Sequence, residues 1–253
     1  MQISFFEEYP TDENLAKLKL LPFKTSLYLA AESVGQFLEL RSRVRRQYKN
    51  VDKIVYWPIL KVNEGYWISA FSKNAAIKRI ILDINSSKEK FPILWDAELP
   101  LLNKKLYFTE VLNFLKNRRI IKKTLQNSNT NHPIIVAAFP QNGISKFLHF
   151  LTGASFYSGD FSYTDMIYTS LLKNVNKMEF LKRTVRESSD KFNQYIVSLG
   201  LIAGGVEGEA PLISKENLLK ELEFVEKQGI NEVVIYRLGG LNKEYLSVLK
   251  KFD

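Results

Sequence analysis

The chain has 253 residues, of which 45% are hydrophobic and 13% aromatic, a balance typical of a folded globular protein and not of a disordered or fibrous one. It contains no cysteine, which excludes a disulfide scaffold, a thiolate metal site and a cysteine nucleophile. The formal net charge of +9 raises the question of an anionic partner.

Short apolar runs alternate with longer amphipathic segments along the chain. The runs predict eight strands, over residues 3–7, 25–30, 53–59, 93–98, 133–139, 165–170, 194–201 and 232–238. The intervening segments predict helices over residues 11–20, 33–48, 73–82, 106–125, 145–151, 177–191, 215–228 and 242–251. Thr11 and Ser33 are typical N-caps, and Gly229 is placed to end the helix before it.

This order of elements predicts the fold. Alternating strands and helices indicate a parallel sheet, and eight such units indicate a single (β/α)8 TIM barrel that spans residues 1–253 as one domain. An open doubly wound sheet is the alternative. It usually has a glycine-rich phosphate loop after its first strand, whereas residues 5–10 here contain no glycine.

Residues 91–100 are the most informative stretch, because an apolar run ends there in two carboxylates, Asp96 and Glu98. Side chains alternate along a strand, so both acids project to the same side, opposite Trp95. Burial and mutual repulsion can raise the pKa of one acid and leave a proton available for catalysis. A purely structural strand seldom needs two inward acids, so we interpret them as a catalytic pair.

The other strand ends are polar and aromatic, and active sites of barrels lie at the carboxyl ends of their strands. These ends carry Glu7, Glu8, Trp57, Tyr168, Glu207, Glu209 and Arg237. Acids among Trp and Tyr are typical of a sugar site, because aromatic faces stack on sugar rings while carboxylates supply acid, base or nucleophile. We therefore expect a carbohydrate or glycoside partner, with Glu7, Trp57, Tyr168 and Arg237 as substrate-binding residues.

Two short motifs resemble a known family. Asp96-Ala97-Glu98 at the fourth strand and Met166-Ile167-Tyr168 at the sixth are similar to the D-x-E and M-x-Y elements of the chitinase-like glycoside hydrolases of family 18. The resemblance implies that Glu98 protonates the glycosidic oxygen. It also implies that Asp96 orients the N-acetyl group of the substrate, which acts as the nucleophile, and that Tyr168 steadies this group.

A second mechanism fits the same barrel, because many retaining glycosidases pair an acid/base at the fourth strand with a carboxylate nucleophile at the seventh. Glu98 would then act with Glu207 or Glu209. Carboxyl groups about 5 Å apart favour a covalent intermediate, and groups about 6.5 to 9.5 Å apart favour inversion by water. The structural alternative is that Glu207 and Glu209 belong to a solvated loop, and that Arg237 is an internal counter-ion of Glu7 or Asp96.

We expect neither a metal nor a cofactor. His132 precedes a strand and His149 lies within a predicted helix, so neither can bind a metal together with the acids, although an all-carboxylate magnesium site would indicate phosphate chemistry. The cations of residues 41–46 and 116–123 fit solvated helix faces, and without a nucleic-acid motif we do not expect a nucleic-acid partner.

The start of the chain has no basic leader, and no window is long enough to span a membrane, so we expect a soluble, cytoplasmic protein without membrane insertion. The leading hypothesis is a glycoside-hydrolase-like barrel with Glu98 as general acid. The alternative is a non-catalytic barrel that keeps its pocket as a binding or assembly surface.

Overall fold

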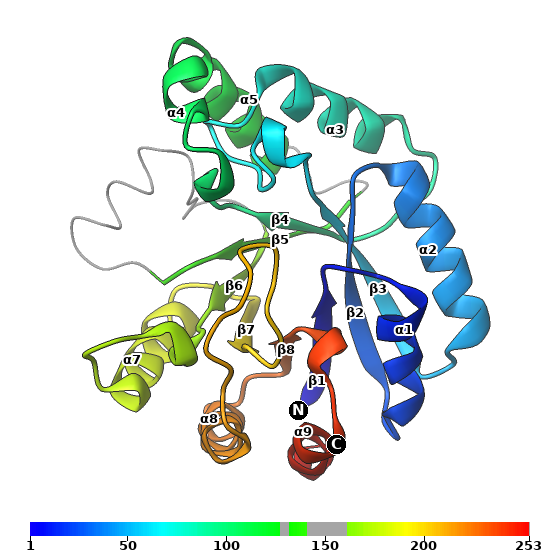
Figure 1. Ribbon diagram of the computed structural model, residues 1–253, viewed down its shortest axis with the longest axis vertical. Coiled ribbons are helices and arrows are strands. Elements are labelled where there is room, and N and C mark those ends of the chain that lie inside the picture. Colours follow the sequence, from blue (N-terminus) through cyan, green and yellow to red (C-terminus); the bar gives the residue numbers. More distant parts are fainter. Residues whose placement is uncertain (127–131, 141–160, 253) are drawn as a thin grey trace. The chain divides into compact units, whose positions relative to one another are not determined.

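A computed structural model of the chain describes residues 1–126, 132–140 and 161–252 (Figure 1). Its strands follow one another from β1 to β8 in a closed barrel, and neighbouring strands pair in parallel. The predicted (β/α)8 barrel is thereby confirmed. The strands are β1 Gln2–Glu7, β2 Thr25–Ala31, β3 Val51–Pro58, β4 Ile93–Asp96, β5 Ile134–Ala138, β6 Ser162–Met166, β7 Tyr195–Gly200 and β8 Glu232–Tyr236.

Helices follow the strands at most of the predicted positions. They are α1 Asp12–Ala16, α2 Val34–Gln47, α3 Asn74–Ser86, α4 Leu106–Thr109, α5 Phe114–Gln126, α7 Lys177–Ser189, α8 Lys215–Lys227 and α9 Lys243–Leu249. The Thr11 side chain caps α1 by accepting from the backbone N–H of Asn14 at 3.2 Å. Gly229 follows α8 with a φ of 73°, as expected of a glycine after a helix. The predicted helix over residues 145–151, which holds His149, lies outside the described residues.

Three differences from the sequence-based prediction affect the candidate site and its surroundings. β4 ends at Asp96, so Glu98 lies beyond the strand, and β6 ends at Met166, so Tyr168 lies beyond it too. The predicted helix over residues 106–125 is wrong as a single helix. It is interrupted at Glu110, where φ is −103° and ψ is 5° and where the side chain accepts from Asn113 Nδ2 at 2.9 Å.

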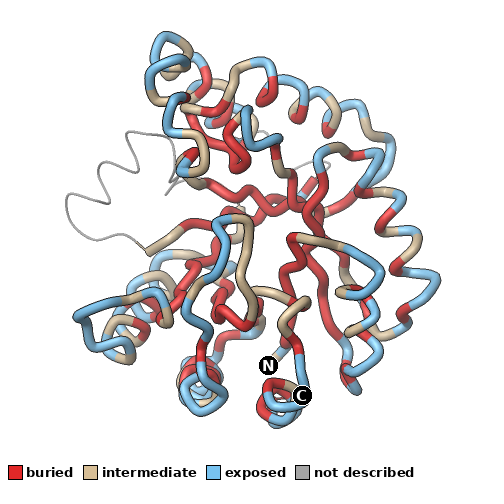
Figure 2. Tube along the Cα trace, viewed as in Figure 1, coloured by how far each residue is buried: buried red, intermediate tan, exposed pale blue. Residues whose placement is uncertain are grey.

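The residues group into two compact units. The first unit comprises Met1–Ala30, Glu39–Val55 and Tyr163–Asp253, and the second comprises Ala31–Leu38 and Tyr56–Ser162. In Figure 2 the strands are buried along their length, whereas the helices alternate between buried and exposed residues. A single domain over residues 1–253 stays a prediction.

The strands of the first unit have two distinct faces. Their outer face meets the helices: Asp165 of β6, for example, accepts from Ser188 Oγ of α7 at 2.5 Å. On the inner face, the ring of Phe6 lies 5.2 Å from that of Tyr28 and 6.2 Å from that of Tyr236, centroid to centroid. Because side chains alternate along a strand, a shift of one residue decides whether a side chain reaches the helices or the inner face.

The second unit has an aromatic core of its own. Phe37 of α2 lies 4.9 Å from Tyr56 and 5.1 Å from Phe91 between ring centroids. His132 packs 4.5 Å from the Phe91 ring, and its Nδ1 lies 3.2 Å from the Phe91 carbonyl oxygen. His132 therefore belongs to this core, at the amino end of β5. Within the described ranges, no helix is both long and apolar enough to cross a membrane.

Candidate active site

In the first unit, the carboxylate of Glu7 joins the end of β1 to the loops around it. Glu7 is fully buried, and its Oε1 accepts from Tyr9 N at 2.8 Å, Asn14 Nδ2 at 3.2 Å and Arg237 Nη1 at 3.1 Å. Its Oε2 accepts from Gly239 N at 2.6 Å. Burial raises the pKa of Glu7, although Arg237 and the two backbone N–H groups act in the opposite direction. These contacts fit a carboxylate that holds loops together.

Glu8 projects the other way, to the inner face. It is 3% exposed, and its Oε2 accepts from the Tyr236 hydroxyl at 2.5 Å and from the backbone N–H of Val206 at 3.1 Å. Burial is the main cause, and the charge of Glu8 the second, of the raised pKa of Tyr236. The Tyr236 hydroxyl therefore keeps its proton and donates it to this hydrogen bond.

The loop after β7 is built around this pair. A Cβ atom added to Gly205 would lie 1.9 Å from Tyr236 Oη and 2.7 Å from Glu8 Oε2, so only glycine fits there. Arg237 Nε donates to the Gly204 carbonyl oxygen at 2.9 Å, and its guanidinium carbon lies 4.7 Å from the centroid of the Tyr9 ring. Burial, followed by the charge of Glu8, raises the pKa of Tyr9 to about 12.

The same loop carries Glu207, and Tyr168 lies near Tyr236. Glu207 is exposed, as is Glu209. Tyr168 is 8% exposed, directly before the short 3-10 helix η5 (Thr169–Leu171), and its ring centroid lies 5.6 Å from that of Tyr236. The inner face at the ends of β6 and β8 therefore presents two neighbouring tyrosine rings, while the carboxyl groups of the loop point to solvent.

In the second unit, the end of β3 meets the end of β4. Trp57 Nε1 donates to Asp96 Oδ2 at 3.1 Å, and the two residues are 3% and 2% exposed. The Asp96 carbonyl oxygen also accepts from Ile68 N at 3.3 Å, in the loop that follows β3. Glu98 is partly exposed two residues beyond Asp96. One acid is thus held by an indole within the protein, and the other has access to solvent.

Asn117 of α5 fixes the loop that follows Trp57. It is fully buried, and its Nδ2 donates to the carbonyl oxygens of Ala70 at 3.0 Å and Ser72 at 2.9 Å. Its Oδ1 accepts from Asn74 Nδ2 at 2.6 Å. The Ser72 hydroxyl in turn donates to the Trp67 carbonyl oxygen at 2.8 Å. The surroundings of Asp96 therefore include an ordered loop and not a freely moving one.

The structure brings some of the predicted site residues into contact. Glu7 pairs with Arg237, and Trp57 with Asp96. Glu207 makes no such buried contact, because it is exposed. The sequence pointed to Glu7 and Arg237 as substrate-binding residues, whereas Glu8 and Tyr236, which form the inner-face pair, were not assigned such a role. Strand alternation was the available signal, because Glu8 follows the inward Phe6 by two residues.

Among the residues that the structure describes, no cluster of three or more His, Cys, Asp or Glu side chains is arranged to hold a metal ion. The acids instead receive hydrogen bonds from the protein itself, as Glu7, Glu8 and Asp96 do.

No protein-family model matches the chain, and no curated protein matches it in sequence. Solved structures match its fold. A chitinase from Chromobacterium violaceum ATCC 12472 matches with a TM-score of 0.58 and 9% identity over 99% of this chain and 98% of that chain. The Bacillus cereus spore cortex-lytic enzyme SleL has a TM-score of 0.56 and 11% identity over 99% and 73%. A GH5 cellulase from an Icelandic hot spring isolate has a TM-score of 0.55 and 16% identity over 96% and 76%.

These matches define the class of fold. At such identities the likeness concerns the fold alone, and the chain has the (β/α)8 barrel architecture found in glycoside hydrolases.

Proposed function

We propose that the chain is a carbohydrate-active hydrolase in which Glu98 is the general acid and Asp96 its orienting partner. One observation carries the proposal: Trp57 Nε1 holds Asp96 Oδ2 at 3.1 Å at the carboxyl ends of β3 and β4, two residues before Glu98. The carboxyl ends of barrel strands are where catalytic residues lie. The fold shared with glycoside hydrolases supports the same class of function.

The two acids are suited to different tasks. Asp96 is buried, and the indole N–H fixes the direction of its carboxylate, as an orienting group requires. Glu98 is partly exposed, so it can reach a bound glycoside and exchange its proton with water. We assign Glu98 the protonation of the glycosidic oxygen and Asp96 the orientation of the group that attacks the anomeric carbon.

The remaining predicted residues take supporting roles in this proposal. Trp57 in the second unit and Tyr168 in the first each offer a ring for stacking on sugar. The four donors on Glu7 lead us to assign Glu7 and Arg237 to holding the loops. Glu207, which is exposed on its loop, is the proposed nucleophile if the reaction proceeds through a covalent intermediate.

Glu98→Gln tests the assignment in a panel of chitin, cellulose and starch oligosaccharides together with aryl glycosides. Loss of a general acid is expected to reduce turnover by about 10²- to 10⁴-fold while substrate binding is kept. The loss should be much smaller for a dinitrophenyl glycoside, whose leaving group needs no proton. Equal turnover by Glu98→Gln and the unmodified chain on every accepted glycoside would refute the role of Glu98.

The two acids of the loop after β7 allow a controlled test of the proposed nucleophile. Glu207 and Glu209 are both exposed and lie two residues apart, so Glu209→Gln controls for loop charge in the Glu207→Gln experiment. A nucleophile at Glu207 predicts that only Glu207→Gln abolishes turnover. Equal effects of both substitutions would exclude it.

The hydrogen bonds that Glu7 and Glu8 accept from protein donors favour a second candidate function, a barrel that binds carbohydrate without hydrolysing it. The same panel separates the two functions. Oligosaccharide binding measured by calorimetry, without release of reducing sugar, would support the binding protein and contradict the hydrolase.

A further inference from the structure

Exposed apolar side chains gather in one segment of the second unit. Of the eleven large hydrophobic side chains that are exposed among the described residues, five lie between residues 101 and 115. They are Leu101 (46%), Phe108 (82%), Val111 (55%), Leu112 (93%) and Leu115 (72%), here called the apolar patch. Single exposed apolar residues are ordinary, but a group of them within one short segment is typical of an interaction surface.

The break between α4 and α5 presents the apolar patch to solvent. On the inner side of this segment Leu106 and Asn117 are buried, and the Phe114 ring lies 5.0 Å from that of Phe71. Glu110 stabilises the break by accepting from Asn113 Nδ2 at 2.9 Å and from Asn74 N at 3.4 Å. The break at Glu110 lies between Phe108 on one side and Val111 and Leu112 on the other. The bonds of Glu110 hold the segment in this path, which leaves the three apolar side chains exposed.

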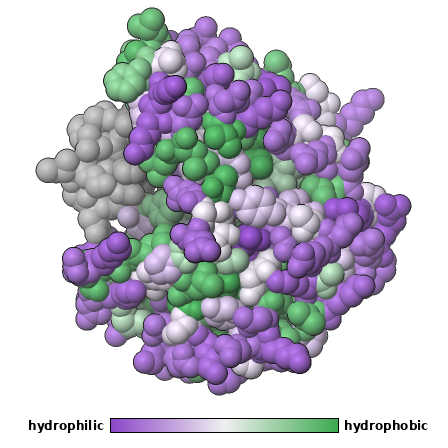
Figure 3. Space-filling view, viewed as in Figure 1, coloured by the Kyte–Doolittle hydropathy of each residue, from purple (hydrophilic) through white to green (hydrophobic). Residues whose placement is uncertain are grey.

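Exposed cations accompany the apolar patch along the chain. Exposed basic side chains lie within it, at Lys104 and Lys105, and follow it along α5, at Lys116, Arg119, Lys122 and Lys123. The only acid between residues 101 and 126 is Glu110, which is partly buried at the break. In Figure 3, hydrophobic side chains project at the edge where Figure 1 places α4, with hydrophilic ones beside them. Exposed apolar and cationic side chains within one segment fit an anionic partner that offers an apolar interior.

We propose that the apolar patch and its flanking lysines and arginines bind the surface of an anionic lipid bilayer. Phe108, Leu112 and Leu115 enter the boundary between headgroups and acyl chains, and the cations contact lipid phosphates. An anionic bilayer has an apolar interior beneath a negatively charged surface over its whole area. A protein partner would need an apolar pocket of matching shape that is bordered by acids. The proposal does not depend on the hydrolase activity.

Vesicle sedimentation of the full chain tests the proposal. The probe is a phosphatidylcholine vesicle with about 30% phosphatidylglycerol, compared with pure phosphatidylcholine at about 150 mM salt, where exposed charges alone are largely screened. We expect binding to the anionic vesicles only. Equal binding to both vesicles, or no binding to either, would overturn the proposal.

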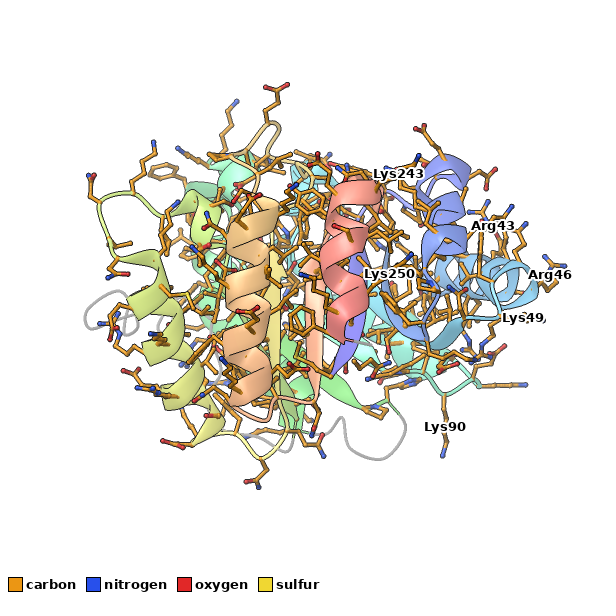
Figure 4. All side chains as sticks on the ribbon, turned by 90° about the horizontal axis from the view of Figure 1, so that it is seen from below. Arg43, Arg46, Lys49, Lys90, Lys243 and Lys250 are labelled. Atoms are coloured by element: carbon orange, nitrogen blue, oxygen red, sulfur yellow. The ribbon has the colours of Figure 1, made fainter. Side chains whose placement is uncertain are left out.

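Substitutions within the apolar patch have matched controls in the same unit. Phe108→Ser with Leu112→Ser should reduce vesicle binding at least tenfold, whereas Leu82→Ser, at a residue 65% exposed on α3, should leave it unchanged. Lys104→Gln with Lys105→Gln should reduce binding about fivefold per charge. Lys88→Gln with Lys90→Gln is the control, and Lys90 projects outward in Figure 4. Equal losses in test and control variants would refute a local site.

Analytical ultracentrifugation of the same variants distinguishes lipid binding from association between copies of the chain. The proposal predicts the same sedimentation coefficient for the unmodified chain and for Phe108→Ser with Leu112→Ser. If the unmodified chain self-associates, the double variant does not, and neither binds vesicles, the apolar patch is an interface between copies and the lipid proposal fails. Unchanged thermal unfolding confirms that the variants are folded.

Discussion

At the residue scale, Glu221 of α8 is an acid buried against the segment that follows Tyr168. It is 3% exposed, its Oε1 accepts from the Thr169 hydroxyl, and its Oε2 has no hydrogen-bond partner among the described residues. Burial raises its pKa from 4.5 to about 7, although the bond from Thr169 and the charge of Lys177 on α7 act in the opposite direction.

This pKa predicts how stability depends on pH. The folded pKa exceeds the unfolded one, so folding favours the protonated acid, and the stabilisation present below pH 4.5 is lost as the pH rises through about 7. The loss is about 3 kcal/mol, at about 1.4 kcal/mol per pH unit. The Glu221→Gln variant cannot ionise at this position. Its free energy of unfolding, relative to that of the unmodified chain, should therefore increase by about this amount as the pH rises from about 5 to about 8.

Urea unfolding at several pH values measures this difference. Glu223→Gln, at an exposed position of the same helix, is the control and should follow the pH profile of the unmodified chain. Parallel pH profiles for Glu221→Gln and the unmodified chain would contradict the prediction.

Residues of the same type at neighbouring positions have different surroundings. Glu7 contacts Arg237 and the loops, whereas Glu8 contacts Tyr236 on the inner face. The sequence indicated that acids lie at the end of the first strand, but it did not identify which acid projects inward. That depends on the register of β1 against β8, where Phe6 pairs with Tyr236.

At the scale of elements, Asn117 links α5 to the loop after β3. Its amide donates to two backbone carbonyl oxygens, those of Ala70 and Ser72. Asn117→Asp keeps the shape but replaces the donor with a carboxylate, leaving both carbonyl oxygens without this donor and placing an acid among acceptors. We expect a loss of about 3 kcal/mol or more in the free energy of unfolding.

The control for this prediction is Asn85→Asp, at an exposed position of α3, which should change stability by less than about 0.5 kcal/mol. Urea unfolding of the two variants compares them directly. A loss for Asn117→Asp no larger than that of the control would show that Asn117 does not hold the loop.

The segment over residues 106–125 shows why element boundaries were harder to predict than element types. Its apolar residues recur at a helical spacing, so a single helix was predicted. The break arises because Glu110 accepts from Asn74, a residue 36 positions away, and from Asn113. Local periodicity carries no information on a partner so distant in sequence.

At the scale of the whole molecule, the net charge of +9 comes from cations on several elements, and some of these cations are paired with acids. Arg43 is paired with Asp12 at 2.8 Å, and Arg79 with Glu64 at 2.7 Å. In Figure 4, Arg46 and Lys49 belong to the segment of α2 and the turn after it, and Lys243 and Lys250 to the segment around α9. The cations of the first unit are thus distributed over separate elements.

We therefore expect any affinity for DNA to be weak and purely electrostatic, and to fall by orders of magnitude between about 50 and 200 mM salt. Fluorescence anisotropy with labelled single- and double-stranded oligonucleotides measures it. Micromolar or tighter binding at about 150 mM salt would contradict this expectation, and Arg46→Gln with Lys49→Gln would then locate the site.

The barrel could be predicted from the chain alone because its signals are local: apolar runs of strand length alternate with amphipathic segments, and strand burial imposes that pattern. The acids at the ends of β1 and β4 could also be predicted, because each directly follows an apolar run in the sequence. The buried pair in each unit depended on tertiary contacts, since Glu8 meets Tyr236 across 228 residues and Trp57 meets Asp96 across 39. Strand register and loop path decide such contacts, and neither is encoded in a short window of sequence.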